Sequence, residues 1–248
     1  MIVRAAVVPH PPLLVPELVA GAVADTHEVR SACLTAAGAL AEVAGDWLAV
    51  AADPAGPAVI EPSAVGTFLG YGVHVPVALS EGPLSEGLPG ADASLPLPAL
   101  LAGWLRGAVG ARTVRVRLIA PELSTSACRR LGADLFETAV ESADPVGLLV
   151  LGDGSNRHTE RAPARPDDRA AGFDAEVAAA LADADSPRLL KLDAALAGEL
   201  GAVGRAAWQV LAGVGAASGV PWRARALYDA APFGVAYHVA VWEPAVGS

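Results

Sequence analysis

Short apolar runs alternate with longer stretches of helical spacing along the 248-residue chain. The runs are rich in Val, Ile and Leu, which is typical of buried strands, and they cover residues 2–8, 47–51, 73–79, 114–119, 146–151 and 235–241. Apolar positions recur with a helical period over residues 25–43, 97–109, 124–142, 173–184 and 205–217. This alternation predicts a mostly parallel sheet with helices on both faces.

One domain spanning residues 1–248 can hold all of these elements, because single α/β domains reach about 200 to 250 residues. Ser124 is expected to cap a helix, and Gly204 is expected to end the helix before it. Segments 52–62 and 80–98 are rich in Pro and Gly and lack periodicity, so we expect loops there. The predicted fold class is α/β, a single three-layer domain with a central, mostly parallel sheet flanked by helices.

Composition and charge exclude several classes of protein. Hydrophobic residues make up 53% of the chain, which is too many for a disordered protein. The formal net charge of −10 argues against nucleic acid as a partner, since nucleic acid requires clustered Lys and Arg. The mean hydropathy is +0.43, yet no apolar run approaches the roughly 18 to 20 residues of a membrane-spanning helix. We therefore expect a cytoplasmic protein without a membrane partner; an oligomer is possible.

His10 is the first candidate for chemistry, because it follows the first predicted strand. Ligands of open α/β sheets gather beyond the carboxyl ends of the strands. Pro9 and Pro11 restrict the backbone on both sides of the imidazole. The alternative is a loop histidine that is hydrogen-bonded to the backbone.

A glycine-rich turn, Gly-Asp-Gly-Ser-Asn-Arg at 152–157, follows the predicted strand 146–151. Its glycines would let the backbone approach a ligand, and Asp153, Ser155 and Asn156 offer hydrogen-bonding groups. The turn matches neither a phosphate-binding loop nor a dinucleotide fingerprint. The alternative is a tight turn whose Asp and Asn side chains satisfy their own backbone.

Four arginines at 157, 161, 165 and 169 follow this turn. They could bind a carboxylate or phosphate, because a guanidinium group matches such anions with two hydrogen bonds. We favour the alternative, a solvated loop paired with its own Glu160, Asp167 and Asp168. Packing is likewise the favoured explanation for Trp208 and for His238, which is expected to be buried and hydrogen-bonded in the last strand.

Four segments in order resemble a known family over nearly the whole chain: VPHPPLL near the start, LLVLGDGSNR, GRAAWQVL, and PFGVAYHVAVW near the end. The chain resembles the catalytic chains of class III extradiol dioxygenases and the related Memo proteins. The resemblance implies the same α/β fold and a ferrous iron held by two histidines and a carboxylate, on which a catechol-type diol is chelated. It also implies a further histidine that acts as acid and base.

Carried onto this chain, the resemblance implies an altered site. His10 matches the first metal histidine, and Asp53 stands nearest the position of the second. Asn156 replaces the acid–base histidine, and asparagine cannot shuttle a proton near neutral pH. Val203 falls at the last ligand position and offers no donor. Fe(II), the cofactor of the resembled family, is therefore expected to bind weakly or not at all.

The leading hypothesis is a dioxygenase-like protein with a remodelled or lost iron site that binds a small molecule or serves a non-standard reaction. The expected catalytic residues are His10, Asp153 and Asn156, and the expected substrate-binding residues are Ser155, Arg157 and Arg205. An alternative is a metal-dependent oxidoreductase that uses His10 with Asp53 and Asp153 as ligands. A third hypothesis is a non-catalytic, partner-binding protein of the Memo type.

Overall fold

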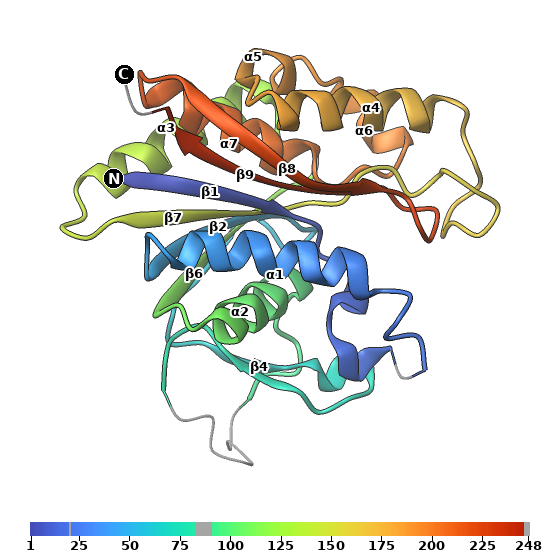
Figure 1. Ribbon diagram of the computed structural model, residues 1–248, viewed down its shortest axis with the longest axis horizontal. Coiled ribbons are helices and arrows are strands. Elements are labelled where there is room, and N and C mark those ends of the chain that lie inside the picture. The colour runs from blue at the N-terminus through green and yellow to red at the C-terminus, as the bar shows by residue number, and fades with distance from the viewer. Residues whose placement is uncertain (20, 83–90, 246–248) are drawn as a thin grey trace.

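A seven-stranded sheet forms the centre of the protein in the computed structural model, which describes residues 1–19, 21–82 and 91–245 (Figure 1). The strand order is β3-β6-β2-β7-β1-β9-β8. The four inner strands β6, β2, β7 and β1 run parallel, and β3, β9 and β8 are antiparallel to their neighbours. Their bounds are β1 Ile2–Val8, β2 Asp46–Ala52, β3 Ala58–Ile60, β6 Thr113–Ile119, β7 Val146–Leu151, β8 Trp222–Ala230 and β9 Tyr237–Pro244.

Helices cover both faces of this sheet (Figure 1). One face carries α1 (His27–Ala41) and α2 (Leu97–Val109). The other face carries α3 (Thr125–Val140), α4 (Arg169–Ala182), α5 (Ser186–Leu189), α6 (Ala194–Glu199) and α7 (Arg205–Ala217). The predicted α/β fold class is confirmed.

Two hydrophobic cores lie on the two faces of the sheet. Every residue of β7 is buried, with Leu149 in the core under α1 and α2 and Leu148 in the core under α3 to α7. Burial on both faces explains why the central strands have continuous apolar runs instead of alternating patterns.

The sequence predicted the bounds of β1, β7, α2 and α7 as the structure has them. The run 73–79 was wrong as a strand of the main sheet: only β5 (Pro76–Ala78) is extended, and it pairs with β4 (Val65–Thr67) in a separate two-stranded sheet. Within the predicted loop 52–62, β3 forms an edge strand of the main sheet and pairs with β6. The edge strand β8 was missed, since its alternately exposed residues form no apolar run.

Two predicted helix boundaries had opposite outcomes. Ser124 caps α3 as expected, since its Oγ accepts a hydrogen bond from the Ala127 N–H at 3.3 Å. Gly204 does not end a helix; it stands directly before α7, while Gly201, with φ of +65°, follows the end of α6. A positive φ strains other residues, so glycine suits the position after a helix.

The predicted loop 80–98 includes residues 83–90, which lie outside the described residues. Three short 3-10 helices complete the described elements, at Pro12–Leu14, Pro16–Leu18 and Phe68–Tyr71. Among the helices of the described ranges, none combines the length and the apolar character needed to cross a bilayer.

Candidate functional site

His10 and the turn at 152–156 lie side by side at the carboxyl edge of the sheet. Their strands β1 and β7 are parallel neighbours, with Val8 opposite Leu151. The backbone N–H of Gly152 donates to the Val8 carbonyl at 3.0 Å, and the backbone N–H of His10 donates to Asp153 Oδ1 at 2.8 Å. The structure therefore brings together His10 and Asp153, two of the residues expected to act in chemistry.

The His10 imidazole is buried with a polar atom unsatisfied. The residue is 8% exposed, and its Nδ1 has no hydrogen-bond partner among the described residues. The nearest charged group is Asp153, whose Oδ1 lies 3.9 Å from Nδ1, beyond hydrogen-bonding distance. A buried polar atom without a partner costs about 1–3 kcal/mol. This ring nitrogen thus keeps an unused hydrogen-bonding position close to Asp153.

Two ionisable side chains that respond to the charge of Asp153 are themselves neutral. Burial, and then the negative charge of Asp153, raise the pKa of Cys33 on α1 well above its ordinary value. The same two causes raise the pKa of Tyr237 at the start of β9. The thiol and the phenol both stay protonated at neutral pH, so the charge beside His10 is that of Asp153.

The glycines of the turn are required by close packing. A Cβ at Gly152 would lie 2.4 Å from the Gly204 Cα, and a Cβ at Gly154 would lie 2.3 Å from Asp174 Oδ1. Ser155 is fully buried; its Oγ donates to the Leu200 carbonyl at 2.9 Å. These hydroxyl and backbone contacts give Ser155 a structural role in the turn, in place of the expected contact with substrate.

Asn156 lies on the other side of the turn, against Gly201. Its backbone N–H donates to the Leu200 carbonyl at 3.2 Å, and its Oδ1 is buried without a partner among the described residues. A cavity of about 240 Å³ opens beside Gly201, at the same edge of the sheet. It is lined by residues that include Pro121, Glu122, Ala197, Gly201, Val203 and Arg205.

A chain of two carboxylates and two imidazoles lies beneath the turn. Asp174 on α4 accepts from the Ser155 N–H at 3.1 and 3.2 Å. Its Oδ2 lies 2.6 Å from His158 Nε2, and its Oδ1 lies 3.3 Å from His238 Nε2. The other nitrogen of His238 lies 2.9 Å from Asp229 Oδ1 on β8. The Asp174 carboxylate therefore ties the turn to α4 and to the β8–β9 pair.

Sequence reasoning anticipated that His238 is buried and hydrogen-bonded, but it missed Asp174 and Asp229. Asp229 is the cross-strand neighbour of His238 in the β8–β9 ladder, so recognising β8 would have suggested that contact. No sequence signal marks Asp174, because it lies in the middle of a helix and meets His238 only after folding.

The environment of His238 raises the pKa of its imidazole. Burial alone would lower its pKa, but hydrogen bonds to Asp174 and Asp229 outweigh burial and raise the pKa above 6.5. The hydrogen bond from His238 in turn lowers the pKa of Asp229. The imidazole thus lies between two carboxylates, which favour its protonated form.

The stability of the protein is expected to depend on pH through His238. Because its folded pKa is raised, its contribution is complete below the unfolded pKa and is lost as the pH rises through the folded pKa. Urea unfolding from about pH 6 upward should show the wild type losing stability faster than His238→Gln, by at most about 1.4 kcal/mol per pH unit. Equal slopes for the two proteins would contradict this prediction.

The described residues do not fit an iron centre. Asp53 Oδ1 accepts a hydrogen bond from the Ala55 N–H at 2.8 Å, so its carboxylate is used within its own turn. Over the described parts of the chain, no group of three or more His, Cys, Asp or Glu side chains could hold a metal ion. The prediction that His10 and Asp53 share a metal is therefore not supported, and neither is a metal site of His10, Asp53 and Asp153.

Arg205 is a buried structural residue. It is 2% exposed, and its guanidinium group donates to the carbonyls of Pro121 and Leu123 at 2.6 Å each and to Gln209 Oε1 at 3.0 Å. The bonds to Pro121 and Leu123 join α7 to the segment after β6. Although Arg205 lines the cavity, the donors expected to bind substrate are used by the protein itself.

The arginines that follow the turn make local contacts. Arg157 donates to the Arg165 carbonyl at 3.2 Å, and its Nε is buried without a hydrogen-bond partner among the described residues. Arg169 pairs with Asp167 at 2.7 Å and with Glu199 at 2.8 Å. The favoured interpretation of a self-paired loop therefore agrees with the contacts of Arg169.

Comparisons with known proteins give no name to this arrangement. No protein-family model matches the chain, and no curated protein matches it. One similar solved structure is that of the uncharacterized protein JW3007 from Escherichia coli K12, which is 12% identical with a TM-score of 0.47. The alignment covers 97% of this chain and 99% of that one. A likeness this distant says nothing about function.

Proposed function

We propose that this protein binds a small, neutral molecule carrying hydroxyl groups at His10 and Asp153, on a scaffold that resembles class III extradiol dioxygenases but without iron-dependent catechol cleavage. One observation carries the proposal: the buried His10 Nδ1 lacks a partner among the described residues and lies 3.9 Å from Asp153 Oδ1.

A ligand hydroxyl group satisfies both atoms. Its oxygen can lie about 2.8 Å from each of two atoms separated by this distance, and a hydroxyl group both donates and accepts. It would donate to the Asp153 carboxylate and accept from His10 when Nδ1 carries a proton. A vicinal diol offers a second hydroxyl group to the neighbouring turn, which agrees with the diol that the family resemblance implies.

The charge of the site favours a neutral ligand. Asp153 would repel an anion, and the protonated Cys33 and Tyr237 supply no compensating positive charge. The metal-dependent alternative draws no support from the donor set, since Asp53 is held in its own turn. The partner-binding alternative expects a closed apolar cavity, whereas His10 and Asp153 are convergent polar groups.

The proposal includes a cytoplasmic location. Cys33 and Cys128 are both free and buried, which suits a reducing compartment.

Calorimetric titration of the metal-free protein with catechol tests the proposal, with phenol as the matched single-hydroxyl ligand. We expect catechol to bind and Asp153→Asn to weaken binding about tenfold, because a hydrogen bond to a charged group is lost. Asparagine can still accept the backbone N–H of His10, so the turn is preserved.

His27→Ala is the control, since His27 is an exposed histidine on α1. It should leave catechol binding unchanged, whereas His10→Ala should weaken it. The proposal is wrong if the metal-free protein binds no catechol, or if both site variants bind it like the wild type. It is also wrong if Fe(II) binds stoichiometrically and supports oxygen-dependent catechol cleavage.

A further inference from the structure

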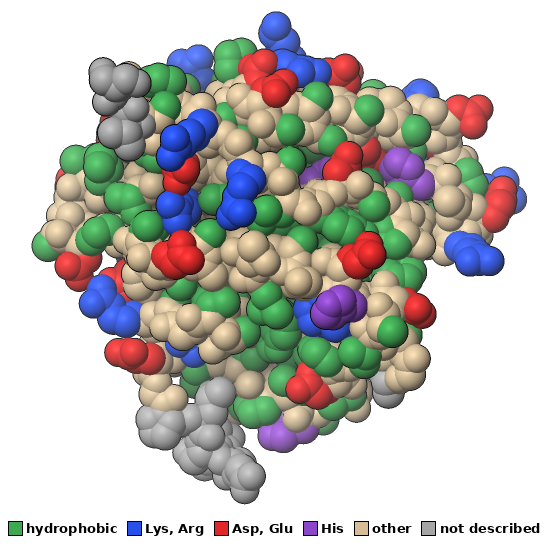
Figure 2. Space-filling model, viewed as in Figure 1, with side chains coloured by type: hydrophobic (Ala, Val, Ile, Leu, Met, Phe, Trp, Pro, Cys, Tyr) green, Lys and Arg blue, Asp and Glu red, His purple; other side chains and the backbone are tan. Residues whose placement is uncertain are grey.

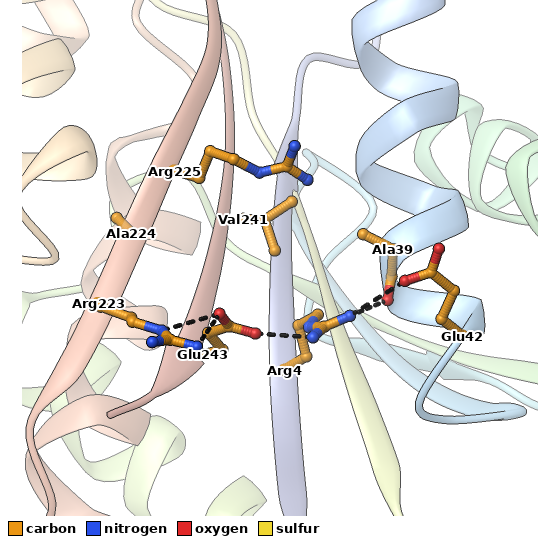
Figure 3. Close-up of a pocket in the computed structure, with 8 residues that line it drawn as sticks. All are labelled: Arg4, Ala39, Glu42, Arg223, Ala224, Arg225, Val241 and Glu243. Carbon is orange, nitrogen blue, oxygen red and sulfur yellow. Dashed lines mark hydrogen bonds and ion pairs between the residues drawn. The ribbon is translucent and has the colours of Figure 1, made fainter. Parts of the chain in front are cut away.

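A second cavity lies near the start of β1, at the end of the strand opposite to His10 (Figure 3). It is enclosed by α1 and the strands β1, β9 and β8. Its volume is about 350 Å³, within the range of about 300–1,000 Å³ that small-molecule sites occupy. The polar residues that line it are Arg4, Glu42, Arg223, Arg225 and Glu243. Figure 2 shows basic and acidic side chains close together over this part of the surface.

The glutamates of this cavity are already engaged. Glu243 accepts from Arg4 Nη2 at 2.7 Å and from Arg223 Nε at 2.9 Å, and the hydrogen bond from Arg4 is the main reason its pKa lies below the ordinary value. Glu42 lies 3.6 Å from Arg4 Nη1. Both carboxylates thus lie beside arginines of the protein, and these positive charges reduce the repulsion that the carboxylates exert on an anionic ligand.

Arg225 differs from the other two arginines. It is exposed and has no hydrogen bond or ion pair within the described residues. Its side chain extends over Val241, its cross-strand neighbour, toward β1 and α1 (Figure 3). The Arg4 Nε is also buried without a partner in the described chain. Three guanidinium groups against two carboxylates leave one positive charge at this cavity, in a protein of net charge −10.

We propose that this cavity binds a small organic anion, namely an oxyanion group attached to an apolar body. The free guanidinium group of Arg225 can hold two oxygens of a carboxylate or phosphate side by side. Val241, Ala39 and Ala224 provide apolar surface for the remainder of the ligand. This site is separate from His10 and Asp153, where the proposed ligand is neutral, whereas this cavity favours an anion.

Titration followed by NMR chemical shifts tests this site with three probes of similar shape. Benzoate and phenyl phosphate carry the two oxyanions, and benzyl alcohol is the neutral counterpart. We expect one or both anions to bind and to shift signals of β8, and their relative affinity distinguishes a carboxylate site from a phosphate site. Arg225→Gln should weaken binding about tenfold.

Arg130→Gln is the matched control, because Arg130 is an exposed arginine on α3 and remote from the cavity. It should bind the anions like the wild type. The inference is overturned if neither anion binds at millimolar concentration, if benzyl alcohol shifts the signals of β8 as strongly as the anions do, or if Arg225→Gln binds the anions like the wild type.

Discussion

Replacing Asp174 with alanine is expected to lower the free energy of unfolding by about 3–5 kcal/mol, because it removes one charged partner from a buried network and leaves the other partners buried. The carboxylate holds the Ser155 N–H, His158 and His238. Without it, a protonated His238 keeps only Asp229 as a counter-charge among the described residues, and the buried Ser155 N–H loses its acceptor. Urea unfolding of the two proteins near neutral pH measures the difference.

Asp134→Ala is the control for this variant, since Asp134 is exposed on α3. Its effect should stay within about 0.5 kcal/mol. Asp174→Asn keeps the shape of the side chain and removes its charge, so its effect should be intermediate. A loss of about 1 kcal/mol or less in Asp174→Ala would show that the network contributes little, whatever its geometry.

The second large effect is expected from Gly152→Ala, at about 3 kcal/mol of lost stability. The new methyl group would meet the Gly204 Cα at 2.4 Å, and Trp208 Nε1 lies 3.3 Å away. The closest atom belongs to the backbone, so it cannot turn aside as a flexible side chain would. Thermal and urea unfolding measure the loss, and catechol binding should fall as the turn moves Asp153 away from His10.

Gly172→Ala separates crowding from the general effect of replacing a glycine. Gly172 lies on the exposed face of α4, and nothing lies within 4 Å of the Cβ position. Alanine there should stabilise the protein by up to about 1 kcal/mol, since it favours the helix. If Gly152→Ala were as stable as Gly172→Ala, the close approach of the 152–156 turn to Gly204 would be wrong.

Local pattern was enough to predict the elements whose environment is uniform along their length. β7 is buried on both faces and α7 is buried over most of its length, so each has a continuous apolar signal. β8 lies at the edge of the sheet and is largely exposed, so its nine residues carry no such signal. The run 73–79 looked like a buried strand of the sheet, yet only Pro76–Ala78 is extended, and it pairs with β4 and packs on α2 without joining the main sheet.

Part of the candidate site was also predictable. His10 and Asp153 each follow a predicted strand closely, and parallel strands end at the same edge, so the sequence predicted that both lie at that edge. Only the structure shows that β1 and β7 are neighbours and bring the two residues together. Whether each side chain is free to bind a ligand does not follow from the topology. Ser155 and Asp53 have the same functional groups in any fold, but here neighbouring backbone groups already occupy them.

Hydrophobic periodicity was sufficient for the α/β class, for the central strands and for placing His10 and the 152–156 turn at the carboxyl edge of the sheet, because each of these depends on local pattern. The strand order, which makes β1 and β7 neighbours, was decided by the tertiary structure. The network of Asp174, His238 and Asp229 and the backbone contacts of Arg205 emerged only on folding. Such contacts join residues far apart in the chain, and whether a polar group stays free depends on which neighbours folding brings to it.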